Sequence, residues 1–200
     1  MKFDPKIHHR HSIRLKGYDY SQAGAYFVTI VAWQREMLFG EIVDGEMVLN
    51  RHGQIVLNAW FDLPNHYRHV VLGAFIVMPN HAHGIIVLVD SGRGGSPISG
   101  GTILPDESLA GSKSLPTKQT RPYGITKPRH GLPEIIRAFK SFSARRIDAL
   151  RHAEGIPVCQ RNYYEHIIRN ESEMDRITRY IESNPLRWAD DDENPNRIQK

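Results

Sequence analysis

The chain has 200 residues, of which 40% are hydrophobic and 24% charged, with a formal net charge of +4 and a pI of about 9.2. This length suits one domain with a core of ordinary size. The single cysteine, Cys159, excludes an intramolecular disulfide framework and a thiolate metal cage, which favours a reducing compartment. No apolar run is long enough to span a bilayer, so we expect a cytoplasmic protein. The mild positive charge suits nucleic-acid binding but occurs in proteins of many functions.

The first half of the chain begins with a strand, a hairpin and a helix. A strand is predicted at 25–33, AYFVTIVAW, because β-branched and aromatic residues dominate it. A hairpin is predicted at 41–49, EIVDGEMVL, where the pair Asp44-Gly45 separates two short extended pieces. Apolar residues recur at helical spacing in 53–64, and a proline marks the end of that helix.

Two further strands are predicted at 70–78 and 81–89, joined through Pro79-Asn80. The fixed φ of proline and the turn-forming side chain of asparagine suit a tight reversal, so these strands form a hairpin. The composition then changes at 91–130, which is dense in Gly, Ser, Pro, Thr and Lys. Because this stretch has too few apolar residues to repay ordering, we expect a mobile insertion and not a boundary between two cores.

The last third of the chain is expected to contain two helices and a strand. An apolar stripe with a basic outer face predicts an amphipathic helix at 132–152. A strand is predicted at 163–169. Asn170 followed by Glu173 resembles a capped helix start, which predicts a helix over 171–184.

Without the small hairpin and the final helix, the order of elements is βαββαβ. This order predicts an α+β fold with a ferredoxin-like antiparallel sheet, helices on one face and an extra C-terminal helix. The chain divides into a basic arm at 1–24, one domain at 25–188 that includes the insertion, and an acidic and polar tail at 189–200.

Two histidines interrupt the apolar segment MPNHAHGIIVLV. On a strand His81 and His83 share one face, where two imidazoles could hold a divalent ion. A bare His-x-His pattern is weak evidence, and a hydrogen-bonded pair at a strand end is an equally good interpretation. The pattern of di-metal hydrolases, HxHxDH, is excluded because Ile85 and Ile86 stand where it needs Asp and His, and HExxH is absent.

The last helix carries the groups that the strand lacks. Tyr180 and Asn184 are four residues apart, so a helix places them on one face, one turn apart. A phenol can act as a nucleophile, and the amide oxygen of Asn184 could be a third metal ligand. The alternative for Tyr180 is that it packs with Ile177 and Ile181 against the sheet.

Four motifs taken together resemble one known family. VMPNHAHGII, LPEIIRAFKS, QRNYYEHIIRN and RYIESNPLRW, in this order, resemble the REP-associated tyrosine transposases, relatives of the single-tyrosine HUH transposases. The resemblance covers nearly the whole chain apart from the insertion at 91–130. One departure is that Cys159 precedes Gln160 where the family often has Trp.

The resemblance implies roles for particular residues. His81 and His83 match the family's metal ligands, Tyr180 the catalytic tyrosine, and Asn184 the polar residue that helps to hold the metal. It implies a single-stranded DNA nicking and strand-transfer enzyme that uses a divalent metal, with Mg or Mn favoured, and forms a 5′-phosphotyrosine intermediate at hairpin-containing DNA. Tyr163 is a less suitable nucleophile, as is Tyr164, because aromatic pairs on strands usually pack.

DNA binding is expected from basic side chains on the predicted helix and the N-terminal arm. These candidates are Arg137, Lys140, Arg145, Arg146, Arg10, Arg14 and Lys16. The alternative for each is a solvated surface charge.

Two other functions stay open, namely a non-catalytic binder of structured single-stranded DNA and a phosphodiesterase that uses water. Both a monomer and a homodimer are compatible with the sequence, and no membrane partner is expected.

Overall fold

The computed structural model describes residues 14–90, 130–153 and 155–197. The predicted insertion at 91–130, except for its last residue, lies outside the described residues, as does most of the predicted N-terminal arm. Within the part of the chain that is described, every helix is too short or too polar to cross a membrane.

The strands and the longer helices follow the predicted order, but the helix predicted at 53–64 is divided into two, and Pro64 lies near the start of the second instead of at the end. The strands are β1 Gly24–Val31, β2 Gly40–Val43, β3 Glu46–Leu49, β4 Val70–Val77, β5 His81–Leu88 and β6 Tyr164–Ile168. The helices are α1 Arg51–Phe61, α2 Leu63–His66, α3 Leu132–Arg151 and α4 Glu171–Ser183, with 3-10 turns η1 Trp33–Arg35 and η2 Pro185–Asp190.

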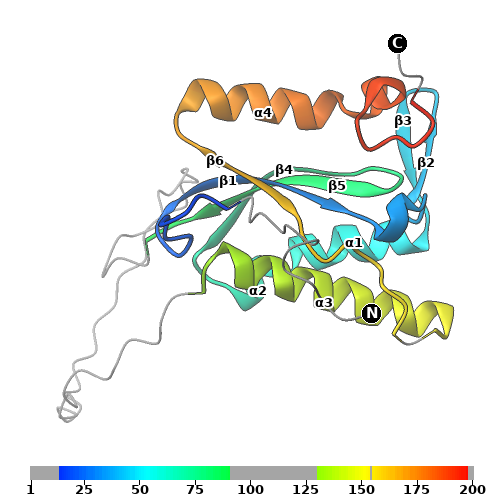
Figure 1. Ribbon diagram of the computed structural model, residues 1–200, viewed down its shortest axis with the longest axis horizontal. Coiled ribbons are helices and arrows are strands. Elements are labelled where there is room, and N and C mark those ends of the chain that lie inside the picture. The colour runs from blue at the N-terminus through cyan, green and yellow to red at the C-terminus, as the bar shows by residue number, and fades with distance from the viewer. Residues whose placement is uncertain (1–13, 91–129, 154, 198–200) are drawn as a thin grey trace, which may run out of the picture. The chain divides into compact units, whose positions relative to one another are not determined.

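Four strands form one antiparallel sheet in the order β4-β5-β1-β6. This is the strand order of a ferredoxin-like βαββαβ fold, so the predicted fold class is confirmed. Helices α1 and α3 cover one face of the sheet, and α4 lies across the other (Figure 1). The separate hairpin β2-β3 turns at Asp44 and Gly45, whose φ values of 52° and 80° are those of the predicted two-residue turn.

Each face of the sheet has its own hydrophobic core. The larger core lies under α1 and α3, where the indole of Trp60 stacks on Phe75 with a centroid distance of 4.3 Å. A Cβ at Gly84 would lie 2.4 Å from the Trp60 ring, so glycine is required for this close approach. The smaller core, under α4, is built from Phe27, Ile85 and three further isoleucines.

The register of the sheet and the start of α4 together place the polar residues of the smaller face. Thr29 of β1 pairs directly with His83 of β5, and Val31 pairs with His81, so these residues are neighbours at one end of the sheet. The Asn170 side chain accepts a hydrogen bond from the Glu173 amide and begins α4, as the sequence predicts. From that start, the stripe of α4 that faces the sheet carries Ile177 and Ile181.

Candidate active site

His81 and His83 lie side by side on β5 and face α4. Their Nε2 atoms are 2.9 Å apart, and both side chains are buried, with exposed fractions of 0% and 3%. Ala82, between them, points to the opposite face and joins the larger core. Two imidazoles therefore converge inside the smaller core, where each ring nitrogen needs a partner.

Asn80 sets the tautomer of His81. Its amide nitrogen donates to the carbonyl oxygens of Glu193 and Arg35, at 2.7 and 3.3 Å, which leaves the amide oxygen facing Nδ1 of His81 at 2.9 Å. Since that oxygen only accepts, Nδ1 of His81 carries the proton. The neutral ring therefore directs the lone pair of Nε2 into the site, as a metal ligand requires.

Thr29 supports His83 in the same way but less rigidly. Its Oγ1 lies 2.9 Å from Nδ1 of His83. A hydroxyl both donates and accepts, so it can support either tautomer of that ring. In the structure as it stands, one of the two facing Nε2 atoms must donate to the other, and His81 cannot be the donor in its neutral form. The proton between the two rings is therefore on Nε2 of His83. For His83 to bind a cation through Nε2, its ring would have to carry the proton on Nδ1 instead, where the Thr29 hydroxyl could accept it.

Burial keeps both imidazoles neutral. It lowers the pKa of His81 to about 4, against which the Asp191 carboxylate acts in the opposite direction. Burial, together with the neighbouring His81, lowers the pKa of His83 well below its usual value. Metals coordinate neutral imidazole, so at neutral pH both rings have the charge state that ligation requires.

Tyr180 brings a phenol to this pair from α4. Its hydroxyl oxygen lies 3.3 Å from Nε2 of His83, and its ring contacts Phe27 edge-on. The side chain is 38% exposed, so the hydroxyl is reachable from outside while the ring is partly covered. Burial, and then the charge of Asp191, raises the pKa of Tyr180, whereas a side-chain hydrogen bond from Asn184 lowers it.

Asn184 follows Tyr180 by one helical turn and closes α4. The residue is 2% exposed, and its Oδ1 has no hydrogen-bond partner among the described residues. A buried amide oxygen without a partner costs free energy unless a further group satisfies it. This buried oxygen can therefore accept a further group, and a cation would satisfy it.

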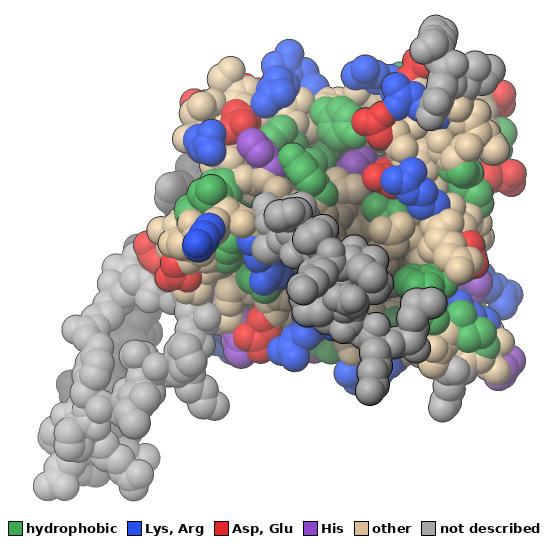
Figure 2. Space-filling model, in the orientation of Figure 1, with side chains coloured by type: hydrophobic (Ala, Val, Ile, Leu, Met, Phe, Trp, Pro, Cys, Tyr) green, Lys and Arg blue, Asp and Glu red, His purple; other side chains and the backbone are tan. Residues whose placement is uncertain are grey.

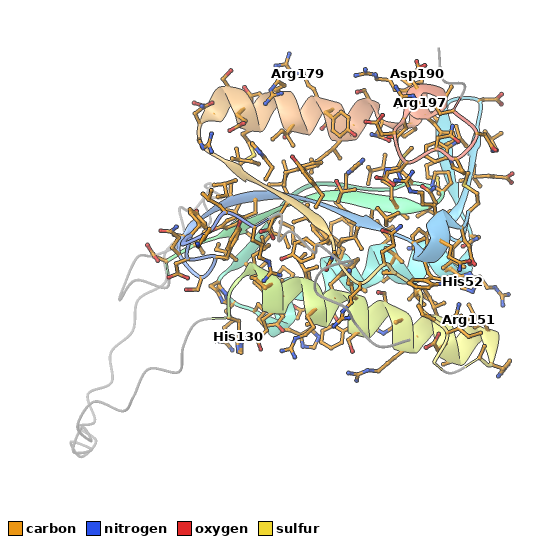
Figure 3. All side chains as sticks on the ribbon, in the orientation of Figure 1. His52, His130, Arg151, Arg179, Asp190 and Arg197 are labelled. Carbon is orange, nitrogen blue, oxygen red and sulfur yellow. The ribbon has the colours of Figure 1, made fainter. Side chains whose placement is uncertain are left out.

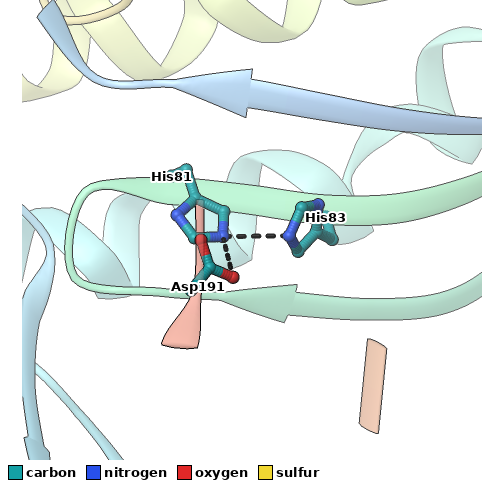
Figure 4. Close-up of side chains that lie close together, drawn as sticks. All are labelled: His81, His83 and Asp191. Atoms are coloured by element: carbon teal, nitrogen blue, oxygen red, sulfur yellow. Dashed lines mark hydrogen bonds and ion pairs between the residues drawn. The ribbon is translucent and has the colours of Figure 1, made fainter. Parts of the chain in front are cut away.

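Asp191 is a member of the site that the sequence reasoning missed. Its Oδ2 lies 4.0 Å from Nε2 of His81, and ligand atoms of His81, His83 and Asp191 all fall within 4.8 Å of one another (Figure 4). The turn η2 brings the chain back to the end of β5. Two residues after Asp191, the backbone carbonyl oxygen of Glu193 accepts a hydrogen bond from the Asn80 side-chain amide. A run of three aspartates after the last helix was a visible signal, but the run does not indicate which of them faces inward.

The donor set fits a divalent cation. Two neutral imidazole nitrogens, a carboxylate and an amide oxygen are a mixed N and O set that suits Mn²⁺ and other first-row ions, and Mg²⁺ where water completes the shell. The buried, orphaned Asn184 oxygen and the inward lone pair of His81 are the observations that support this fit.

The cations predicted on α3 lie on the other side of the sheet from Tyr180 (Figure 1). Lys140 donates to the carbonyl oxygens of Gln160 and Asn162 at 2.6 and 2.7 Å, and burial lowers its pKa. Arg137 pairs with Glu134 on its own helix.

The two remaining arginines of α3 are also engaged nearby. Arg146 pairs with Asp62, and Arg145 donates to the Ser141 hydroxyl. The structure therefore engages these cations locally and does not bring them to the site.

The predicted cations of the N-terminal arm are only partly described. Arg14 lies 3.8 Å from the carboxylate of Glu165, a side chain that is 2% exposed. Lys16 is exposed, and Arg10 falls outside the described residues. Arg14 thus connects the start of the described chain to β6.

Two consecutive tyrosines, Tyr163 just before β6 and Tyr164 at its first position, lie in different surroundings. Tyr163 packs against the larger core, and burial strongly raises its pKa. Tyr164 faces the α4 side, where its ring contacts Phe27, but it is 51% exposed. Both rings therefore pack against a neighbour, but Tyr164 keeps about half of its surface exposed.

Comparisons with known proteins identify one relative by sequence and one solved structure of similar fold. An uncharacterized protein of Haemophilus influenzae is 38% identical over 190 residues, which cover 95% of this chain and 96% of the relative. A REP-associated tyrosine transposase bound to a REP hairpin has a similar structure, with a TM-score of 0.51 and 15% identity over 88% of this chain and 74% of that one.

A second structure, of a candidate transposase from Deinococcus radiodurans, aligns with a TM-score of 0.42 and 16% identity over 84% of this chain and 95% of that one. No family model matches the sequence. At such low identity the structural likeness shows the fold alone, whereas the sequence match shows kinship. The chain therefore belongs to the same family as the Haemophilus influenzae protein, and it has the fold of the REP-associated tyrosine transposase.

Proposed function

We propose that the protein is a metal-dependent transposase-like enzyme that nicks and rejoins single-stranded DNA at hairpin-containing sites. The observation that carries the proposal is the position of the Tyr180 hydroxyl, 3.3 Å from Nε2 of His83, beside buried donors that suit a divalent cation. The fold is that of a transposase whose structure contains a REP hairpin, which supports the choice of DNA as substrate.

Tyr180 is the nucleophile of the proposed reaction. Its oxygen attacks the scissile phosphorus, a P–O bond to the 5′ side of the downstream fragment forms, and the bond to the 3′-oxygen of the upstream fragment breaks. The phenol loses one proton and the leaving 3′-oxygen gains one, so the step is balanced. Because the ester bond is kept as phosphotyrosine, attack by another 3′-hydroxyl can rejoin strands without a nucleotide cofactor.

The residues around the phenol have distinct tasks. His81 and His83 would hold the cation from β5, Asn184 from the end of α4 and Asp191 from the turn after η2. When bound, a divalent cation supplies Lewis-acid polarisation of the scissile phosphate. Phe27 supports the Tyr180 ring from the sheet and so keeps its hydroxyl at the histidine pair.

The test is a denaturing gel with hairpin-bearing single-stranded oligonucleotides that have randomised flanks, each labelled at one end, in Mg²⁺ or Mn²⁺. We expect a protein-linked product that carries the 3′ label, and a shortened free product that carries the 5′ label. Tyr180→Phe should abolish both products, whereas Tyr67→Phe, on the α3 side of the sheet, should form them as the wild type does.

Three results would contradict the proposal in different ways. A 5′ label on the protein would reverse the polarity of the attack. Cleavage without an adduct, unaffected by Tyr180→Phe, would indicate a phosphodiesterase that uses water. Binding without any product, unaffected by His81→Ala, would indicate a non-catalytic DNA-binding protein.

A further inference from the structure

A groove of about 700 Å³ runs beside Tyr180, between α4 and the edge strand β6. Its floor includes Phe27, and its sheet side is formed by Tyr164 and His166, which are two residues apart and therefore share a face of β6. The volume is within the range of roughly 300–1,000 Å³ that is usual for small-ligand sites. The groove is thus large enough for a nucleotide-sized group next to the nucleophile.

The helix side of the groove follows one stripe of α4 and its extension. Arg176, Tyr180, Ser183 and Arg187 recur at intervals of four, three and four residues and all line the groove. In Figure 2 basic side chains gather over α4, with hydrophobic and histidine side chains on the surface next to them. A positively charged wall opposite exposed aromatic rings is the usual construction of a site for single-stranded nucleic acid.

The arginines that line the groove differ in whether another residue holds the guanidinium. Arg176 pairs with Glu173 at 3.4 Å, and Arg179, labelled in Figure 3, donates to the carbonyl oxygen of Asp175. The guanidinium of Arg187 forms no hydrogen bond or ion pair with any residue that the structure describes, although it is close enough to influence the Tyr180 hydroxyl electrostatically. Arg187 is therefore the cation best placed to receive a phosphate beside the nucleophile.

The opposite wall offers a stacking surface that is not otherwise used. Tyr164 is 51% exposed, although its ring contacts Phe27 with a centroid distance of 6.2 Å, so about half of this side chain is accessible to a base. His166 is held by the Glu173 carboxylate, which accepts its Nε2–H at 2.7 Å. Since Glu173 also accepts from the Arg169 amide, the wall that carries both rings is tied to the first turn of α4.

We propose that this groove is the subsite for one nucleotide next to the scissile phosphate, with its base stacked on Tyr164 and its phosphate held by Arg187. The inference rests on the proposed function, because it takes the strand at Tyr180 to be single-stranded nucleic acid. It assigns DNA recognition to the α4 side of the sheet, away from the cations of α3. Tyr164 and Arg187 act here in binding and not in bond breaking.

The test uses oligothymidylate that carries one 5-iodouracil, which forms photochemical crosslinks to aromatic rings stacked on it. With Tyr180→Phe protein, so that no phosphotyrosine forms, we expect the crosslinked peptide to contain Tyr164. In the same background Tyr164→Ala should remove the crosslink and weaken binding by roughly 5- to 150-fold, the range for one stacked base. Tyr164→Phe keeps the ring and should bind as tightly as the parent.

Salt dependence tests the phosphate contact separately. Arg187→Gln should weaken binding and reduce the slope of log affinity against log salt by about 0.7, the value for one phosphate contact on a single strand. Arg51→Gln removes the same charge from α1, on the other side of the sheet, and should leave the slope unchanged. Circular dichroism of each variant shows whether the fold is intact.

The outcomes separate this inference from the proposed function. Crosslinks confined to α3 or to the segment around Arg14, with undiminished binding by Tyr164→Ala, would overturn the groove as the subsite while leaving the nicking result untouched. Crosslinks to Tyr164, together with wild-type protein that forms no adduct, would support the groove and contradict the nicking activity.

Discussion

The amide oxygen of Asn80 lies 2.9 Å from Nδ1 of His81, and this contact sets the direction in which His81 presents its lone pair. Asn80 belongs to the turn between β4 and β5, and its amide nitrogen also holds the carbonyl oxygens of Arg35 and Glu193. One side chain thus orients a candidate ligand and connects the hairpin to η1 and to the C-terminal segment.

Asn80→Ala should weaken Mn²⁺ binding by about 10- to 100-fold, the usual effect of removing the group that orients a metal-ligating histidine. Without the acceptor, the His81 ring loses its fixed tautomer. Isothermal titration calorimetry of the folded variant measures the change. Asn65→Ala removes an amide from α2 and serves as the matched control. Equal affinity in the Asn80 variant and the wild type would mean that this asparagine has no role in the site.

Asp191→Asn should also reduce the affinity for Mn²⁺, by about tenfold or more, because the substitution keeps the shape of the side chain but removes the negative charge from the donor set. The neighbouring Asp190 is exposed and lies in η2, so Asp190→Asn is a control with the same chemical change one residue away. Electron paramagnetic resonance of free Mn²⁺ provides the measurement. The assignment of Asp191 as a ligand is wrong if both variants bind equally well.

The fold was predictable because its information is local in the sequence. The β-branched and aromatic composition of the strands, the helical spacing in α1 and α3, and the Asn170 cap of α4 are all short-range patterns, and they give the βαββαβ order with its extra helix. The helix predicted from 53 begins two residues earlier, at Arg51, because the Asn50 side chain caps α1 by accepting from the His52 and Gly53 amides.

The site was only partly predictable because its remaining members depend on tertiary structure. Nothing periodic indicates that η2 returns Asp191 to His81, or that Asn80 receives an imidazole N–H. The cations of α3 show the opposite error, in which a predicted binding residue is already engaged. A basic helix face suggests charges that can bind DNA, yet the Lys140 ammonium donates to backbone carbonyl oxygens of the segment before β6.

Gly84→Ala should destabilise the fold by about 1–3 kcal/mol, as expected for overpacking a well-packed core. The added Cβ would lie 2.4 Å from the Trp60 ring and 2.8 Å from that of Phe75. Urea unfolding followed by tryptophan fluorescence measures the loss. In a Trp60→Phe background, which removes the atoms nearest to the new methyl group, the same substitution should cost less. An equal cost in both backgrounds would show that the indole is not the cause.

Cys159 should react slowly with thiol reagents in the folded protein. Burial raises the pKa of its thiol to about 11 from an ordinary value of 9.0, although the nearby Lys140 ammonium acts in the opposite direction. Only the thiolate reacts, so at pH 8 the folded protein should react about 100-fold more slowly than the unfolded chain in urea. The chain contains one cysteine, so the reaction can be followed by absorbance without interference.

The pH profile of that reaction separates pKa from simple shielding. The unfolded chain should reach half of its maximum rate near pH 9, where its thiol titrates, and level off above that pH. The folded protein should continue to gain about tenfold per pH unit up to pH 10, because its thiol is still protonated there. By the same linkage, the folded state holds this proton more tightly, so the contribution of Cys159 to stability is complete below pH 9 and declines between pH 9 and 11. A folded-state profile that levels off at pH 9 would show that access to the thiol, and not its pKa, limits the reaction.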